Sequence, residues 1–484
     1  MNNQIVRLFG FVVVLYALLF GFTSYWSVFD ADGLEANTAN RRPLLEEQQI
    51  ERGEILAADG SVIARSVPQG KGDDRIFVRR YPEGTLYGNP IGYSFVQLGR
   101  VGFELEHNDE LVGEKTEFLT VLDELRGRAQ EGDNVQSTLD PDAQRAAVEG
   151  LGGQRGSVVA IVPSTGEVRA MVSIPAYDPN DVQNPAVFKQ LNADEDAPLF
   201  NRATQAGYQP GSTMKVVTAA AAIDSGEYSP DDTVSGRSPK EISGVPLQNA
   251  GGESFGEIPL TEALTNSVNT VWAEVGEDLG AETMLEYMDR FGFNRKPRLD
   301  YPDFQLATSG VFEGNRLLTS ADAIDVGRVA IGQERLNVTP LQMAEVPAAV
   351  ANGGELMEPR LWSKVIDPDG RETKLDPDRQ SRVMSEETAN TLTAMMTDVV
   401  NEGTGGAAAL AGIDVAGKTG TAEIDIAGGI NQAWFIGFAP ADDPEIAVAA
   451  TVERTSGFGG EVAAPIAQQV MEVLLAKGDG GDEG

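Results

Sequence analysis

The sequence predicts an α+β protein with a single N-terminal transmembrane helix and at least two globular domains. Three observations support this prediction. Residues 8–29 contain no charged side chain, residues 156–173 have the pattern of a β-hairpin, and two later stretches favour helices. The chain of 484 residues also exceeds the roughly 250–300 residues of one hydrophobic core. We therefore expect a strand-rich, non-catalytic pedestal domain at 30–150 and a larger domain at 151–477.

The apolar run at 8–29 is long enough to cross a bilayer as a helix, which takes about 20 residues. A cleaved signal peptide is the alternative, but its apolar core is usually only about 7–15 residues long. We expect a membrane anchor preceded by a short cytoplasmic tail at 1–7. Arg7 precedes the run and Arg41 and Arg42 follow it, so basic residues do not define its orientation.

The pedestal domain is polar and mixed in sequence, with extended runs such as 60–64 and turn signals such as 82–84. His107 is the only histidine of the chain and lies in a polar stretch, so we predict that it is a surface residue. One histidine cannot build a histidine-rich metal site, and His107 lies far along the chain from any candidate serine.

The larger domain alternates between strand and helix patterns. Two extended runs flank a turn at 163–166, which is typical of a buried antiparallel hairpin. Beyond it we expect helices at 215–224, 386–400 and 465–477 and strands at 433–438 and 445–452. Residues 478–484 are rich in glycine and acid, and we predict a disordered tail.

The composition excludes several classes of function. Acidic residues outnumber basic residues 74 to 37, and the net charge of −37 argues against a nucleic-acid partner. The chain has no cysteine, which removes thiolate metal sites, disulfides and cysteine nucleophiles together. We expect no metal site.

Ser212 and Lys215 form the first chemical motif. Pro210 and Gly211 precede Ser212 and an apolar run follows Lys215, so we expect a helix start with both side chains facing one side. A lysine can activate a serine hydroxyl only when it is neutral, so burial and a nearby cation must lower its pKa. Ser212 is therefore the candidate nucleophile, Lys215 its base, and the N–H of Ser212 a candidate oxyanion donor.

Two further motifs follow. Ser267 and Asn269 lie in a segment expected to connect helices, where a hydroxyl can relay a proton to a leaving amine and an amide can bind substrate backbone. An extended segment carries Lys418 for a substrate carboxylate, Thr419 and Gly420 for close backbone pairing, and Thr421 as the second oxyanion donor.

Each motif alone is common, but the three occur once each and in an order typical of penicillin-binding proteins and class A β-lactamases. Over nearly its whole length the chain resembles the class B, monofunctional penicillin-binding proteins, which are peptidoglycan D,D-transpeptidases of the penicillin-binding protein A type. The matching stretches are 52–55, 201–203, 209–212, 330–333, 339–344 and 418–423.

This resemblance implies a serine β-lactamase-like transpeptidase domain, with a mainly antiparallel sheet between helical layers. It implies that Ser212 attacks the penultimate D-Ala carbonyl of a stem peptide ending in D-Ala-D-Ala and that a second stem-peptide amine resolves the acyl-enzyme. β-Lactams would trap Ser212 as a slow ester. No cofactor is implied, and the role is cell-wall synthesis during growth or division.

The resemblance also sets the expected surroundings of the enzyme. A catalytic domain outside the plasma membrane, on a single-pass anchor, would work with a polytopic glycosyltransferase of the RodA/FtsW type. The stretch between the anchor and the larger domain is too short for a glycosyltransferase domain of its own. One departure is local: Ala57 and Ala58 replace a usual Asp-Arg pair, which places the salt bridges of the pedestal domain in doubt.

Three alternatives stay open at this point. Residues 412–419 satisfy the Walker A pattern of nucleotide-binding proteins, although Gly420 and the alternating residues after it do not favour the helix that a P-loop requires. A β-lactamase or β-lactam sensor would use the same three motifs. A scaffold that recruits envelope proteins through the pedestal domain would make catalysis secondary.

Overall fold

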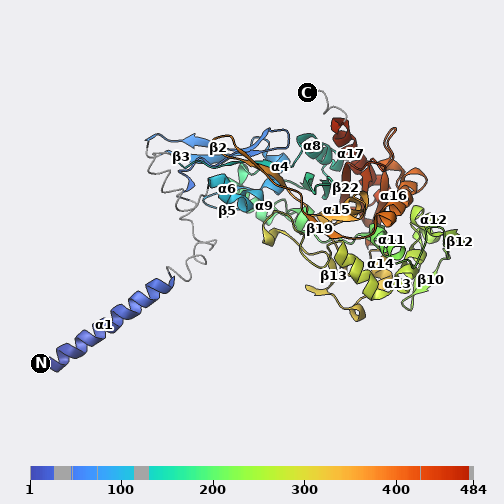
Figure 1. Cartoon of the computed structure of the whole chain (residues 1–484), viewed down its shortest axis with the longest axis horizontal. Coiled ribbons are helices and arrows are strands. Elements are labelled where there is room, and N and C mark those ends of the chain that lie inside the picture. The colour runs from blue at the N-terminus through green and yellow to red at the C-terminus, as the bar shows by residue number, and fades with distance from the viewer. Residues whose placement is uncertain are drawn as a thin grey trace.

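The structure is a computed structural model that describes residues 2–26, 45, 47–72, 75–113, 130–425 and 427–478. It confirms the predicted α+β class, with a strand-containing N-terminal part and a larger C-terminal part (Figure 1). Of the predicted disordered tail, residues 479–484 lie outside the described residues, as do residues 27–29 of the predicted anchor.

Helix α1 (Asn2–Ser24) covers most of the predicted anchor and begins six residues before it. Its stretch Asn3–Ser24 is long and apolar enough to cross a membrane, and no other described helix meets that test. Most of its side chains are exposed, which suits a helix surrounded by lipid. The helix fits a membrane anchor or a signal sequence.

A six-stranded sheet forms the frame of the pedestal domain. Its strands, in spatial order, are β18 (Glu372–Lys374), β17 (Trp362–Ile366), β6 (Asn134–Ser137), β1 (Ile55–Leu56), β2 (Val62–Gln69) and β3 (Ile76–Arg80). Strands β1 and β6 pair in parallel, and the other pairs are antiparallel. Two of the six strands come from beyond residue 361, so the chain returns from the larger domain to complete this sheet.

Short elements cover the remainder of the pedestal domain: α4 (Gly84–Ile91), β4 (Ser94–Phe95), β5 (Gly99–Arg100), α5 (Phe103–Glu106) and α6 (Asn108–Val112). His107 lies at the junction of α5 and α6, and the prediction that it is a surface residue is wrong. It is 4% exposed, its ring lies 4.2 Å from that of Phe103 and 5.5 Å from that of Trp362, and its Nε2 lies 3.5 Å from Asp300 Oδ2. It is therefore part of the contact between the two domains.

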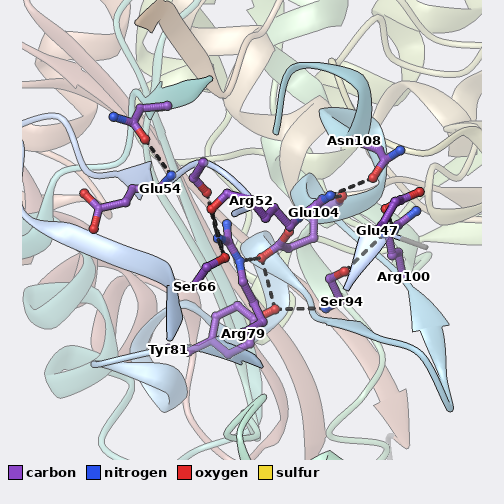
Figure 2. Close-up of polar contacts among 12 residues, drawn as sticks. Glu47, Arg52, Glu54, Ser66, Arg79, Tyr81, Ser94, Arg100, Glu104 and Asn108 are labelled. Carbon is purple, nitrogen blue, oxygen red and sulfur yellow. Dashed lines mark hydrogen bonds and ion pairs between the residues drawn. The ribbon is translucent and has the colours of Figure 1, made fainter. Parts of the chain in front are cut away.

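A buried ionic cluster holds the pedestal domain together (Figure 2). Arg52 Nε donates to Glu104 Oε2 at 2.8 Å, and Arg79 Nε donates to Glu104 Oε1 at 2.6 Å. The Glu104 side chain is fully buried and also accepts from the Tyr81 hydroxyl at 3.0 Å. Because of its two arginine partners, the pKa of Glu104 falls from 4.5 to about 2 despite its burial. The pedestal domain keeps strong internal ion pairs although Ala57 and Ala58 carry no charge.

A five-stranded antiparallel sheet forms the centre of the larger domain. Its spatial order is β20 (Ala416–Asp425), β21 (Ile430–Ala439), β22 (Ile446–Thr455), β7 (Gly156–Ile161) and β8 (Val168–Ile174). Strands β7 and β8 are the predicted hairpin, paired from Gly156 with Ile174 to Ile161 with Val168. Successive residues of β7 point to opposite faces, so Val158 and Val159 belong to two separate apolar cores.

Helices cover both faces of this sheet. On one face, α8 (Pro141–Leu151) packs with α17 (Ala464–Gly478); on the other lies α15 (Pro340–Ala351), beside α11 (Lys215–Asp224) and α16 (Glu386–Asn401). This is the arrangement that the resemblance implied. Helix α8 begins at Pro141, before the predicted boundary at 150, yet it packs on this sheet, and the boundary stays a prediction.

The helices begin where the sequence offers caps. Asp140 accepts the Asp142 and Ala143 N–H groups at 2.9 and 3.0 Å at the start of α8, whose first residue is Pro141.

The other described elements of this domain are α9 (Pro185–Ala193), α10 (Arg202–Gln205), α12 (Leu260–Thr265), α13 (Asn269–Arg290), α14 (Val326–Ala330), β9 (Thr233–Ser235), β10 (Lys240–Ile242), β11 (Val245–Leu247), β12 (Glu257–Pro259), β13 (Gly310–Glu313), β14 (Arg316–Leu318), β15 (Leu336–Asn337), β16 (Glu355–Met357) and β19 (Arg379–Arg382).

Candidate active site

Ser212 lies in the 3-10 turn η4 (Gly211–Met214), which leads directly into α11. Gly211 enters this turn with a φ of +53°, a conformation that favours glycine. Thr213 and Lys215 are fully buried, whereas Ser212 is half-buried. The buried residues hold the turn in place, while Ser212 stays partly exposed.

Lys215, the first residue of α11, brings the first two motifs together. Its Nζ donates to Ser267 O at 2.7 Å, to Ser267 Oγ at 3.1 Å and to Asn269 Oδ1 at 2.7 Å. Burial lowers the pKa of Lys215 well below its ordinary value, and the positive charge of Lys418 lowers it further. Both conditions that a lysine base needs are therefore met: it is buried and it has a second cation nearby.

Ser267 lies between α12 and α13, and Asn269 lies at the start of α13, at the helix connection that the sequence predicted. Ser267 has a φ of +56°, which is unusual for a residue with a side chain and is found most often at functional sites. Asn269 is the first residue of α13, and its Nδ2 donates to Gln248 O at 3.3 Å while its Oδ1 accepts from Lys215. The strained turn directs both the hydroxyl and the amide to the lysine.

Residues 418–421 all lie on β20, the edge strand of the five-stranded sheet. Lys418 is fully buried, its Nζ donates to Thr419 O at 3.1 Å, and burial lowers its pKa from 10.5 to about 7. Thr421 Oγ1 accepts the Gly459 N–H at 3.1 Å. Because β20 has one free edge, an extended substrate can lie beside it.

Strand β20 and the Ser212 turn are in direct contact. A Cβ built on Gly211 would lie 2.8 Å from Thr421 O, and one built on Gly420 would lie 2.6 Å from Pro210 O. The third motif is thereby adjacent to the first. The structure thus brings Lys215 together with Ser267 and Asn269, and it packs Gly420 and Thr421 against the turn that carries Ser212. Lys418 and Thr419 precede these two residues on the same strand.

The same strand contradicts the Walker A interpretation of residues 412–419. A P-loop binds phosphate at the N-terminus of the helix that follows its lysine. Here Lys418 and Thr419 lie inside β20, which continues to Asp425. The match to the nucleotide-binding pattern is therefore accidental.

Two neighbours of the site were not singled out from the sequence as site residues. Thr404 and Thr419 share a hydrogen bond of 2.6 Å between their hydroxyls. Gly332 has a φ of +74° and accepts the Gly211 N–H at 3.0 Å, and a Cβ built on it would lie 2.0 Å from Gly211 O. The glycine-rich stretch 403–406 predicts a turn near the third motif, in agreement with this contact. The matching stretch 330–333 did not indicate a contact with the Ser212 turn.

Replacement of Gly420 by alanine should slow acylation of Ser212. The added methyl group would meet Pro210 O and the Thr213 methyl group, at 2.6 and 2.8 Å, and would push β20 away from the turn. A shift of that size costs about 10²-fold in rate. The measurement is the acylation rate with a fluorescent penicillin. Gly406→Ala is the matched control because its added Cβ has only an ordinary contact, 3.7 Å from Val400 O; equal rates for both variants would contradict the contact.

Replacement of Lys418 by methionine should shift the pH dependence of acylation. Loss of its charge removes one of the two causes that lower the pKa of Lys215, so that pKa rises toward its ordinary value. Since only neutral Lys215 can accept a proton, the rising part of the rate profile should move to higher pH. The control is Lys189→Met, at an exposed position. A rising part that stays in place in the Lys418 variant would show that the two lysines are not coupled.

Comparison with known proteins agrees with this geometry. Residues 156–472 match the family described as "Penicillin binding protein transpeptidase domain", and residues 52–135 match the "Penicillin binding protein A dimerisation domain". The peptidoglycan D,D-transpeptidase PbpA of Mycolicibacterium smegmatis is 36% identical over 99% of this chain and 100% of its own length.

Solved structures give the same result. Penicillin-binding protein A from M. tuberculosis, as a ceftriaxone acyl-enzyme complex, has a TM-score of 0.80 at 32% identity, over 89% of this chain and 100% of that one. Its penicillin G acyl-enzyme complex has a TM-score of 0.78 at 32% identity, over 88% and 100%. The chain therefore belongs to the penicillin-binding protein transpeptidase family, in the class B branch that contains penicillin-binding protein A.

Proposed function

We propose that Ser212 is the nucleophile through which this peptidoglycan D,D-transpeptidase forms its acyl-enzyme on stem peptides ending in D-Ala-D-Ala. The observation that supports this assignment best is the position of Lys215. Its amine has three acceptors from the second motif, within 2.7–3.1 Å, and lies one helical turn after an accessible serine. We also infer that β-lactams acylate Ser212, since relatives of known structure form such acyl-enzymes.

The first half of the reaction follows from these positions. Neutral Lys215 accepts the Ser212 hydroxyl proton while Oγ bonds to the penultimate D-Ala carbonyl carbon. Backbone N–H groups of Ser212 and Thr421 stabilise the oxyanion. As the C–N bond breaks, the proton passes from Lys215 through the Ser267 hydroxyl, 3.1 Å away, to the leaving D-Ala amine.

The second half reverses these roles. An amine of a neighbouring stem peptide attacks the ester carbonyl, gives its proton to Lys215 through Ser267, and releases Ser212 with its hydroxyl restored. Throughout, Asn269 and the edge of β20 hold the backbone of the donor peptide. Lys418 and Thr419 bind the terminal carboxylate of the donor before acylation, and this carboxylate leaves with the released D-Ala. A substrate carboxylate beside Lys418 would favour the charged form of this lysine, whose pKa is about 7 in its buried position.

The test is release of D-Ala from a pentapeptide donor in the presence of an amine acceptor. We expect product from the wild-type chain and from Ser225→Ala, a serine at the other end of α11, but none from Ser212→Ala. Product from Ser212→Ala would disprove the assignment. Rapid turnover of penicillin would instead favour a β-lactamase, and growth supported by Ser212→Ala would favour a scaffold role.

We further propose that α1 is a single-pass anchor in the plasma membrane, with the catalytic domain outside. The length and apolar character of α1 support the anchor, and the location of peptidoglycan outside the membrane supports the orientation. A glycosyltransferase of the RodA/FtsW type is the expected partner. Purification from membranes with the chain intact and with α1 removed tests both points: a RodA/FtsW protein should co-purify with the intact chain only.

A further inference from the structure

The pedestal domain contains a cavity of about 210 Å³, and none of the residues that line it belongs to the candidate active site. This volume is far above the roughly 10–15 Å³ that a single water needs. Its charged lining residues are Arg52, Arg79, Arg100 and Glu47, so cations outnumber anions. Its apolar lining residues include Ile50, Phe77, Phe95, Leu98 and Val112. A cavity of this size that is lined by both guanidinium groups and apolar side chains is suited to a small amphipathic anion.

The three arginines differ in how many of their side-chain nitrogens have a hydrogen-bond acceptor (Figure 2). Arg52 uses its three nitrogens on Glu104 Oε2, Asn108 Oδ1 and Glu104 O, at 2.8, 2.7 and 2.6 Å. Arg79 binds Glu104 Oε1 through Nε and Gly53 O through Nη1, at 2.6 and 2.7 Å. Its Nη2 is buried and has no acceptor among the residues that the structure describes. The whole residue is only 5% exposed.

Arg100 is the third arginine of the lining. Its Nη2 pairs with Glu47 and its Nε donates to Ser94 Oγ at 3.1 Å. The side chains of Arg100 and Glu47 are 11% and 19% exposed. The Arg100 side chain is therefore slightly more exposed than those of Arg52 and Arg79, at 11% against 8% and 3%.

The charges around the cavity do not cancel. Among the described residues, three guanidinium groups lie beside two carboxylates, those of Glu47 and Glu104, which leaves one positive charge. Burial lowers the pKa of Arg52 to about 10, and repulsion by Arg100 and Arg79 adds to this effect while Glu104 opposes it. An uncompensated buried charge is unfavourable. It is also unexpected in a chain whose net charge is −37.

We propose that this cavity binds a carboxylate carried on a short apolar group, with the carboxylate against Arg79 and Arg100 and the apolar group against Phe77, Phe95 and Leu98. The planar carboxylate matches the fork of a guanidinium group, and both Arg79 and Arg100 line the cavity. Its single negative charge equals the local excess. A phosphate group, with a charge nearer two, fits this balance less well. The free C-terminal residue of a peptide and a small free acid share this chemistry.

The test is isothermal titration of the whole chain in detergent with four probes: acetyl-alanyl-valine with a free carboxylate, the same peptide as its amide, isovalerate and inorganic phosphate. We expect the peptide acid to bind and its amide to bind at least about tenfold more weakly, since a charge-assisted hydrogen bond is lost. Binding should weaken with salt. If isovalerate binds as tightly as the peptide acid, the ligand is a small free acid. If isovalerate binds much more weakly than the peptide acid, the ligand is the C-terminal end of a peptide.

Two substitutions locate the binding. Arg79→Lys keeps the charge but loses the guanidinium fork, and Arg100→Gln removes the excess charge from a less buried position, so it remains informative if Arg79→Lys does not fold. Each substitution should weaken the binding of the peptide acid about tenfold or more. Arg371→Gln, which breaks an exposed ion pair with Asp367, is the matched control and should leave the affinity for the peptide acid unchanged. The proposal is overturned if the acid and amide bind alike, if phosphate binds as tightly as the acid, or if Arg100→Gln binds like wild type.

Discussion

Replacement of Lys215 by methionine should lower the rate of Ser212 acylation by about 10²–10⁴-fold, the usual contribution of a general base. Methionine has a similar length and tolerates burial, so the change removes the amine with little change in packing. Lys215 is the only described cation within hydrogen-bonding distance of both Ser267 and Asn269. The measurement is the second-order rate of labelling by a fluorescent penicillin.

The control is Lys189→Met, which removes one positive charge from an exposed position of α9. The fluorescent penicillin should label this variant at the wild-type rate. In the wild type the rate should rise as the pH rises through the lowered pKa of Lys215, because only the neutral amine accepts a proton. A Lys215→Met variant that keeps both the wild-type rate and this pH dependence would show that another group is the base.

Replacement of Glu104 by glutamine should destabilise the pedestal domain by about 3–5 kcal/mol, because two buried arginines would lose their anionic partner. The Arg52 and Arg79 side chains are only 8% and 3% exposed, so bulk solvent compensates poorly for loss of the carboxylate. The measurement is the urea dependence of unfolding. Glu83→Gln is the matched control, since its pair with Arg145 is exposed and such pairs contribute about 0–1 kcal/mol. Equal losses of stability for the two variants would contradict this account.

The same carboxylate gives the sign of one pH effect. The pKa of Glu104 falls from its ordinary value of 4.5 to about 2 in the folded chain, so its stabilising effect is complete above pH 4.5. It is lost as the pH falls toward 2. The wild type should therefore lose more stability than Glu104→Gln over this acidic range, which melting temperatures at several pH values would show.

Much of the fold was predictable because its elements are local. The hairpin of β7 and β8 shows as two apolar runs around a turn, and the Ser212 turn shows as Pro-Gly followed by an apolar helix. The three motifs could be recognised because each combines reactive residue types at a fixed spacing. Their meeting in space then follows from the fold, through contacts such as Lys215 with Asn269.

The features that the sequence did not indicate depend on contacts between distant segments. Strands β17 and β18 join the pedestal sheet more than two hundred residues after β6, and nothing in their local pattern indicates that partner. His107 looks exposed by its polar neighbours, yet its ring packs against Trp362.

The most direct test of the account is to locate the covalent adduct that penicillin G forms with the whole chain. Mass spectrometry of the intact protein and of its peptides, followed over time, gives both the site and the lifetime of the ester. The account predicts one long-lived adduct on the peptide that contains Ser212, present in Ser225→Ala and absent from Ser212→Ala. An adduct on another residue, or none in the wild type, would contradict the assignment of Ser212, and rapid loss of the adduct would identify a β-lactamase instead.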